Sequence, residues 1–260
     1  SGIYPKTLGA NNPLHEFRLY DRAFDLTEMQ DLQTELNNKY SKPIVWVDSS
    51  DTSTYTLSGS DVLTLDNKGS LGGAMTLNGT VKFANDGFES WSASDYITRD
   101  LGEPFLPNNS FTIATTFDLQ DLTSGNNTSY NWFSSVYGGN LDRLEILRDT
   151  NTKMTALTRA SASYYINAVN NNLGVQTVFH TYDLSNNTLN QLNSDGTNLI
   201  STSVNFTNTS NLITYLLRYG GSAINSGANN PLHEFRLYDR AFSLTEMQDL
   251  QTELNNKYTP

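Results

Sequence analysis

The chain has 260 residues, a formal net charge of −11 and no cysteine. The length suits one large β domain with a core of its own. The acidic composition argues against a nucleic-acid partner, because phosphate binding requires basic residues. The absence of cysteine excludes disulfides, zinc–thiolate sites and cysteine nucleophiles. No apolar run is long enough to span a membrane, so no membrane insertion is expected.

The first predicted element is a segment that occurs twice. Residues 10–40 read ANNPLHEFRLYDRAFDLTEMQDLQTELNNKY, and residues 228–258 repeat them with one difference, Asp25 against Ser243. HEFRLYD alternates as a strand does. Both differing residues precede a glutamate by three positions, so each copy predicts a capping box. The helix that follows places its apolar residues in one stripe, which is Leu244, Met247, Leu250 and Leu254 in the second copy. Two asparagines are expected to end it.

Short strands separated by Gly, Asn, Asp and Ser clusters are predicted in the middle of the chain. Residues 110–119 and 174–183 alternate in polarity, which predicts half-buried strands. In the first of these, one face carries Phe111, Ile113, Thr115 and Phe117. Further strands are predicted at 44–48, 80–84, 144–149, 153–159, 198–204 and 212–219. The Asp-Gly pair within 193–197 is typical of a tight hairpin. Many short strands with regular turns predict a β-sandwich or jelly roll.

Three of these stretches carry a resemblance to a known family. They are IVWVDSSDTSTYTLSGSDVLTLDNKGSLGGAMTLNG at 44–79, SFTIATTFDL at 110–119 and HEFRLYDRAFSLTEMQDLQTELNNKY at 233–258. The chain resembles the concanavalin A-like lectin/glucanase superfamily, in the laminin-G-like form of phage, viral and bacterial surface proteins. The resemblance implies an all-β fold, a jelly-roll sandwich of two antiparallel sheets, here with short terminal amphipathic helices.

The spacing of the two copies predicts the domain organisation. The second copy begins 218 residues after the first, which is the length of one such domain. We expect residues 41–260 to form a whole domain, and residues 1–40 to be the C-terminal strand–helix remnant of a preceding tandem repeat. The alternative is that the first copy serves this same domain as an extra strand and helix. A remnant is expected to dock outside the domain or to form a homodimer through residues 10–40.

The sequence contains few residues in a pattern typical of a catalytic or metal-binding site. Glycoside hydrolases of the superfamily carry two carboxylates on one strand face, whereas Glu145 has Arg143 and Leu147 at the alternate positions and Asp149 lies four residues away. The sequence therefore predicts no enzyme. Laminin-G-like relatives often hold calcium through loop aspartates, which makes Asp48 and Asp51 candidate ligands of a structural calcium. A turn-capping role for Asp48 is the favoured interpretation, and no other cofactor is expected.

Aromatic residues are the stronger indication of a binding site. Sugar rings stack their apolar faces on aromatic rings, and a concave sheet lined in this way is a sugar site in the family. The candidates are Tyr130, Trp132, Tyr137, Tyr164, Tyr165 and His180. The alternative is that aromatic residues on these strands face the core. Tyr164 and Tyr165 are adjacent, so a strand would place them on opposite faces. His180 is expected on the polar face of its strand, as a sugar contact or as an ordinary surface histidine.

These observations predict a non-catalytic carbohydrate-binding or adhesion module of a repetitive surface, fibre or virion protein. Its expected partners are a cell-surface glycan or polysaccharide and the neighbouring repeats, and its expected location is extracellular, on a cell or virion surface. A structural spacer in a tandem-repeat stalk is the alternative. Glycoside hydrolase activity is the least supported of these three functions.

Overall fold

The chain divides into two compact units, Ser1–Lys42 and Pro43–Pro260. The computed structural model describes residues 17–32, 42–90, 92, 94–101, 110–119, 131–137, 143–148, 154–160, 163–169, 174–194, 196, 198–204, 206, 213–217 and 231–259. In the first unit, residues 26–32 are helical and residues 17–20 belong to no strand. Within the described ranges, no helix is both long and apolar enough to cross a membrane.

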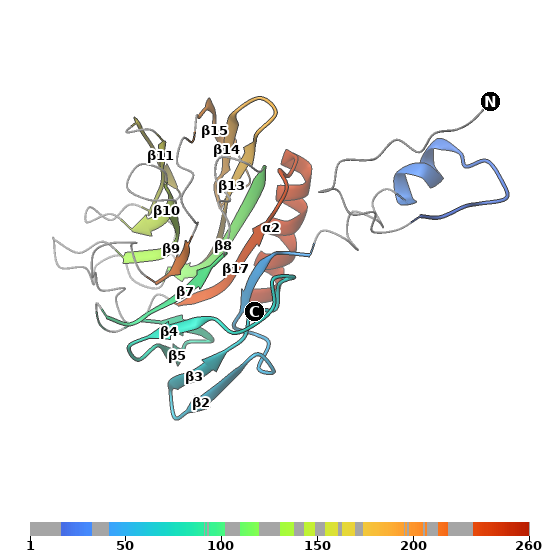
Figure 1. Cartoon of the computed structure of the whole chain (residues 1–260). Coiled ribbons are helices and arrows are strands. Elements are labelled where there is room, and N and C mark those ends of the chain that lie inside the picture. The colour runs from blue at the N-terminus through green and yellow to red at the C-terminus, as the bar shows by residue number, and fades with distance from the viewer. Residues whose placement is uncertain are drawn as a thin grey trace, which may run out of the picture. The chain divides into compact units, whose positions relative to one another are not determined.

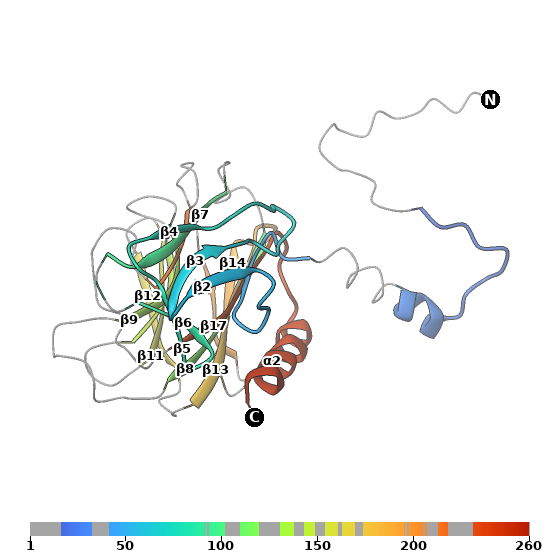
Figure 2. The same ribbon diagram turned by 90° about the horizontal axis from the view of Figure 1, so that it is seen from below.

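Two antiparallel sheets make up the second unit (Figures 1 and 2). The larger sheet has the order β15 (Asn198–Ser203), β14 (Thr188–Leu192), β13 (Gly174–Asp183), β8 (Phe111–Leu119), β17 (Leu232–Tyr238), β6 (Gly87–Glu89), β5 (Lys82–Ala84), β3 (Asp61–Leu65) and β2 (Tyr55–Ser58), and β1 (Val45–Asp48) also pairs with β17. The smaller sheet has the order β12 (Ser163–Val169), β11 (Met154–Ala160), β10 (Arg143–Arg148), β9 (Asn131–Tyr137), β16 (Ile213–Leu216), β7 (Tyr96–Asp100) and β4 (Thr76–Asn78). The expected all-β sandwich is confirmed.

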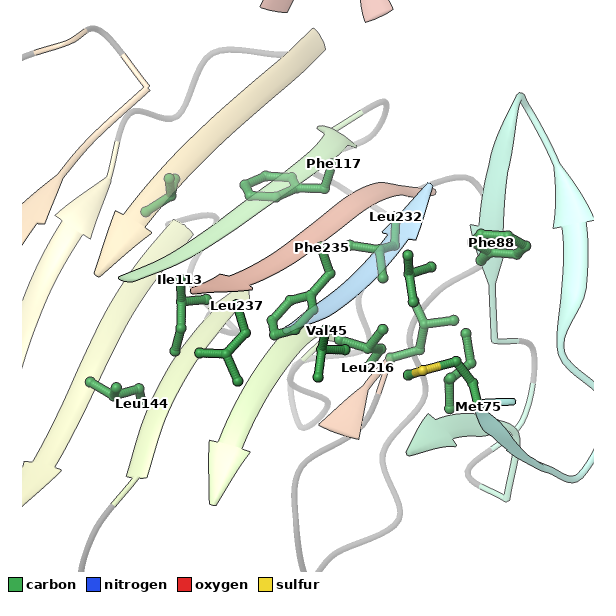
Figure 3. Packing of buried hydrophobic residues seen from close by; sticks show 14 of the residues in the cluster. Val45, Met75, Phe88, Ile113, Phe117, Leu144, Leu216, Leu232, Phe235 and Leu237 are labelled. Carbon is green, nitrogen blue, oxygen red and sulfur yellow. The ribbon is translucent and has the colours of Figure 1, made fainter. Parts of the chain in front are cut away.

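The main core lies between the two sheets. Ile113 and Phe117 of β8 belong to one buried cluster with Leu144 and Leu216 of the smaller sheet (Figure 3). Phe111 of β8 is part of the same cluster. The face of β8 that the sequence predicted to be apolar is therefore the inner face. The hairpin predicted at 193–197 is also confirmed, because β14 and β15 pair across it.

Helix α2 (Leu244–Tyr258) covers the outer face of the larger sheet. A second buried cluster forms between them, with Ala114, Phe179 and Leu192 from the strands and Tyr238, Phe242, Met247, Leu250 and Leu254 from the last segment of the chain. Both faces of β8 and β13 are consequently buried. The expectation that these strands are half-buried is wrong, because alternation along a strand does not reveal a helix that packs on its second face.

The predicted capping box begins α2. The Ser243 hydroxyl accepts a hydrogen bond from the Glu246 backbone N–H at 3.2 Å, and the Glu246 carboxylate accepts one from the Ser243 N–H at 2.8 Å. The helix continues past the two asparagines to Tyr258. The predicted stripe is buried except for Leu244, which is 43% exposed.

Candidate functional site

One cross-strand row of the smaller sheet joins two of the predicted aromatic residues. Tyr137 of β9 pairs with Arg143 of β10, Arg143 pairs with Arg159 of β11, and Arg159 pairs with Tyr164 of β12. Directly paired residues share one face of an antiparallel sheet. The register therefore places two tyrosines and two arginines in line across four strands.

Burial of Leu144 shows which face this row occupies. Leu144 is 2% exposed and belongs to the core between the sheets. Successive residues of a strand alternate between faces, so Arg143 and its row lie on the opposite face, here called the outer face of the smaller sheet. The row of Leu144 contains Thr158 and Tyr165. Tyr164 therefore takes an outer-face position and Tyr165 a core-face position.

A β-bulge brings Trp132 to the same outer face. The β9–β10 register shifts after Ile146, so that Leu147 pairs with Trp132. Leu147 alternates with Ile146 and shares the face of Arg143. Without the extra residue, alternation from Ser134 would assign Trp132 to the core face. Trp132, Tyr137 and Tyr164 thus all occupy outer-face positions of one sheet.

The sequence did not identify the other members of this face. Arg159 was not singled out, and neither was Tyr215 of β16, which pairs with Ser135 and belongs to the row of Glu145. The register identifies both residues: Arg159 lies on a consecutive strand whose pairing alternation alone does not fix, and Tyr215 lies on a strand distant in sequence from β9. Tyr130, also a candidate, lies outside the described residues.

Within the described strands, no carboxylate residue occupies a position next to Glu145 on this face. Its cross-strand partners are Ser135 and Leu157, and its neighbours at alternate positions on β10 are Arg143 and Leu147. A retaining glycosidase places its two carboxyl groups about 5 Å apart. Within the described part of the smaller sheet, the positions next to Glu145 do not offer that arrangement.

His180 lies in the interior of the sandwich, and its expected position at the surface is wrong. It is 1% exposed and pairs with Ile113, a core residue of β8. On β13 it alternates into the same face as Val178 and Tyr182, which also belong to the core. Its Nε2 has no hydrogen-bond partner among the described residues. The polar residues of this face misled the prediction, because the second sheet covers them.

The buried histidine predicts a pH dependence of stability. Burial lowers the pKa of His180 to about 3, whereas in the unfolded chain the pKa of a histidine is about 6.5. The unfolded state therefore binds more protons between these values, and stability falls as the pH falls, by up to about 1.4 kcal/mol per pH unit. Urea unfolding measured between pH 4.5 and 6.5 gives the slope of the unfolding free energy against pH. This slope should be smaller for His180→Asn than for the unchanged chain. Equal slopes would contradict the prediction, whatever the absolute stabilities.

The turn that holds Asp48 and Asp51 is capped by both carboxylates. Asp48 accepts hydrogen bonds from the N–H and hydroxyl of Ser50, at 3.0 and 2.7 Å. The capping role predicted for Asp48 is confirmed. The Lys68 ammonium lies 2.7 Å from a carboxylate oxygen of each aspartate, so an ammonium stands between the two proposed calcium ligands. The described residues contain no group of three or more acidic or histidine side chains arranged to hold a metal ion.

Asp48 also belongs to a buried network that the sequence did not predict. The closing network consists of Trp46, Asp48, Glu234, Arg236, Lys257 and Tyr258. Glu234 is 1% exposed and accepts hydrogen bonds from Trp46 Nε1 at 2.7 Å, from Lys257 Nζ at 2.8 Å and from the Tyr258 hydroxyl at 2.8 Å. Arg236 donates to the same carboxylate. These contacts tie β1, β17 and the end of α2 together.

Charges within the closing network compensate one another. Burial alone would raise the pKa of Asp48, but hydrogen bonds from Lys257, Lys68 and Ser50 lower it well below its usual range. Burial, followed by the charges of Glu234 and Asp48, raises the pKa of Tyr258. Perturbed groups often mark active sites, but structural ion-pair networks perturb pKa values as well. Here each named group has a partner within the network, which favours a structural role.

His233 supports the same closure. Its Nδ1 lies 3.0 Å from the backbone oxygen of Asp86, and its ring stacks on Tyr258 at a centroid distance of 4.8 Å. The predicted role of this histidine in fixing the closing strand agrees with these contacts. Its equivalent in the first copy, His15, lies outside the described residues.

No protein-family model and no curated protein matches the sequence. The fold is similar to receptor-binding domains of botulinum neurotoxins. The receptor-binding domain of botulinum neurotoxin D matches with a TM-score of 0.60 and 10% identity, over 82% of this chain and 53% of that domain's chain. A structure of type C, whose cell entry is described as dependent on interaction with two ganglioside molecules, matches with a TM-score of 0.58 and 12% identity over 85% of this chain and 53% of that chain. That of a C/D mosaic serotype has a TM-score of 0.57 at 11% identity.

These similarities establish the β-sandwich fold alone, because the identities are so low. The chain spans about half the length of the neurotoxin binding domains that it matches. What those proteins bind is therefore a property of the neurotoxins, and it is carried to this chain only as a proposal.

Proposed function

We propose that residues 43–260 form a non-catalytic carbohydrate-binding module of the concanavalin A-like, laminin-G-like type, which binds a surface glycan on the outer face of its smaller sheet. The observation that carries the proposal is the placement of Trp132, Tyr137 and Tyr164 at outer-face positions. Aromatic residues at outer-face positions of a sheet suit the apolar faces of sugar rings. The fold shared with receptor-binding domains supports an extracellular role on a cell or virion surface.

The two arginines of the row narrow the ligand class. Arg143 and Arg159 stand side by side between Tyr137 and Tyr164. Guanidinium groups bind carboxylates and sulfates with paired hydrogen bonds. In a chain of net charge −11, two neighbouring arginines on one face favour glycans that carry acidic sugars over neutral ones.

Two adjacent tyrosines provide the matched test. Tyr164→Ala should lower the affinity for the best glycan found on an array of surface glycans and polysaccharides at least tenfold, about 1.4 kcal/mol, without changing the melting temperature. Tyr165→Ala, at a core-face position, should lower the melting temperature instead. Trp132→Ala should behave like Tyr164→Ala. If Trp132→Ala and Tyr164→Ala unfold the domain, these residues belong to the core and the proposed face is wrong.

Acidic and neutral glycans form the second arm of this experiment. Arg143→Ala and Arg159→Ala should weaken binding of acidic glycans and leave neutral ones unaffected. Losses of equal size for both classes would contradict the acidic preference while leaving the glycan site itself supported by Tyr164→Ala.

A structural spacer in a tandem-repeat stalk is the alternative function. It is favoured by the repeated terminal segment, which needs only a neighbouring domain as its partner. An array on which the folded domain binds no glycan would support the spacer and reject the glycan-binding module.

A further inference from the structure

The repeated segment adopts two different tertiary states in one chain. In the second copy Phe235, Leu237 and Tyr238 lie in β17 and are 0%, 0% and 4% exposed. Their equivalents in the first copy belong to no strand and are far more exposed: Phe17 77%, Leu19 87% and Tyr20 42%. The same contrast holds in the helix, where Met29 is 51% exposed and Met247 is 2% exposed. Identical side chains are thus buried in one copy and exposed in the other.

The start of the helix is nevertheless the same in both copies. Asp25 and Glu28 form the capping box of the first helix, with Glu28 N–H donating to Asp25 at 2.8 Å, as Ser243 and Glu246 do in the second. Arg22 pairs with Glu28 at 2.7 Å, as Arg240 pairs with Glu246 at 2.7 Å. The helix start of the first copy is therefore formed, whereas residues 17–20 lack both the strand pairing and the burial that their equivalents have in the second copy.

The second copy defines the surface that the segment fits. Strand β17 pairs with β8, β6 and β1, and the helix packs its apolar stripe on Ala114, Phe179 and Leu192. Polar side chains of the repeat are equally specific. Arg236 packs on the Trp46 ring at 4.7 Å, and Glu234 joins Trp46 and Lys257 in the closing network. Trp46 and Asp48 lie outside the repeat, so a fitting partner must supply their equivalents.

We propose that residues 10–40 are the closing strand and helix of a second β-sandwich of the same construction as residues 43–260, joined to the N-terminal side of this one in a tandem array. Exposed apolar segments and helix faces mark interaction surfaces, and the sequence of this segment specifies its partner. A second copy of this chain is a poor partner, because its slot is filled by an identical segment on the same polypeptide. A covalent tether gives that segment an effective concentration in the millimolar range. The array then has a period of 218 residues.

An extended chain tests the proposal directly. In this chain a second copy of residues 43–227 is joined directly to Ala10 of residues 10–260. The added copy lacks its own closing segment, and residues 10–40 follow it in the place of residues 228–258. We expect the calorimetric unfolding enthalpy to be about double that of the 260-residue chain, since this enthalpy scales with the folded length. Residues 17–20 belong to no strand in the 260-residue chain, so their backbone amides should exchange rapidly there and become protected in the extended chain.

Phe17→Asp serves as the matched control in both chains. In the 260-residue chain it should leave the melting temperature unchanged, whereas in the extended chain it should remove about half of the unfolding enthalpy. An extended chain that keeps the enthalpy of one sandwich and exposed amides at 17–20 would overturn the proposal. So would a 260-residue chain that forms dimers at micromolar concentration with those amides protected, because a second copy would then be the partner.

Discussion

Truncating Phe235 to alanine should lower the free energy of unfolding by about 3–5 kcal/mol, whereas the same change at Phe17 should alter it by less than about 0.5 kcal/mol. Phe235 is fully buried in the core between the sheets, and Phe17 is 77% exposed. A domain of ordinary stability has about 5–15 kcal/mol in total, so Phe235→Ala should remove a large part of it. Urea unfolding of both full-length variants measures the difference.

The two sites form an internal control that few proteins offer. Residues 10–24 and 228–242 are identical, so strand propensity and local contacts are closely matched in the two variants. The difference between them therefore isolates tertiary burial. Equal losses of stability would mean that the first copy is an integral part of the sandwich. The expected result agrees with a further expectation, that removal of residues 1–40 leaves a folded domain of similar thermal stability.

Local signals in the sequence were sufficient for much of the fold. The inner face of β8, the capping boxes and the hairpin before β15 depend on residues within a few positions of one another. Each is fixed by alternation, by a side-chain cap or by a turn, and each was predicted. Short strands such as β6 and β4 have three residues each, too few for a recognisable period, and they were missed.

Features that depend on distant partners could not be predicted. Trp46 and Glu234 are 188 residues apart, and Tyr258 and Asp48 are 210 residues apart. The core position of His180 depends on a second sheet that covers its face. The outer-face position of Trp132 depends on a bulge in the β9–β10 register. A one-residue shift of this kind reverses the face of every residue beyond it, and nothing in the local alternation announces it.

Glu234→Ala is the second change that we expect to be severe, with a loss of about 3–5 kcal/mol. The carboxylate is 1% exposed and compensates Arg236, which is 9% exposed, as well as the ammonium of Lys257. Its removal would leave the guanidinium buried, with hydrogen bonds to Tyr238 and Glu253 at 3.4 and 3.0 Å and the Trp46 ring beside it. Glu253 is 60% exposed and compensates the buried guanidinium only weakly. The expected cost is that of a poorly compensated buried charge, and it exceeds the net stabilisation that the ion pair itself provides.

A double variant separates these two contributions. In Glu234→Leu/Arg236→Met both charges of the buried pair are replaced by apolar groups of similar length, and such replacements are often neutral or stabilising. Lys257 is 27% exposed and keeps its contact with Asp48 at 2.8 Å, so it does not become an isolated charge. We therefore expect the double variant to be more stable than Glu234→Ala in urea unfolding, although it lacks more of the network.

A loss of less than about 1 kcal/mol for Glu234→Ala would contradict the prediction, because the pair would then stabilise the fold no more than an ordinary surface salt bridge does. The charged groups of the closing network would then contribute little to holding the closing strand, because the buried carboxylate would stabilise it no more than a solvated one.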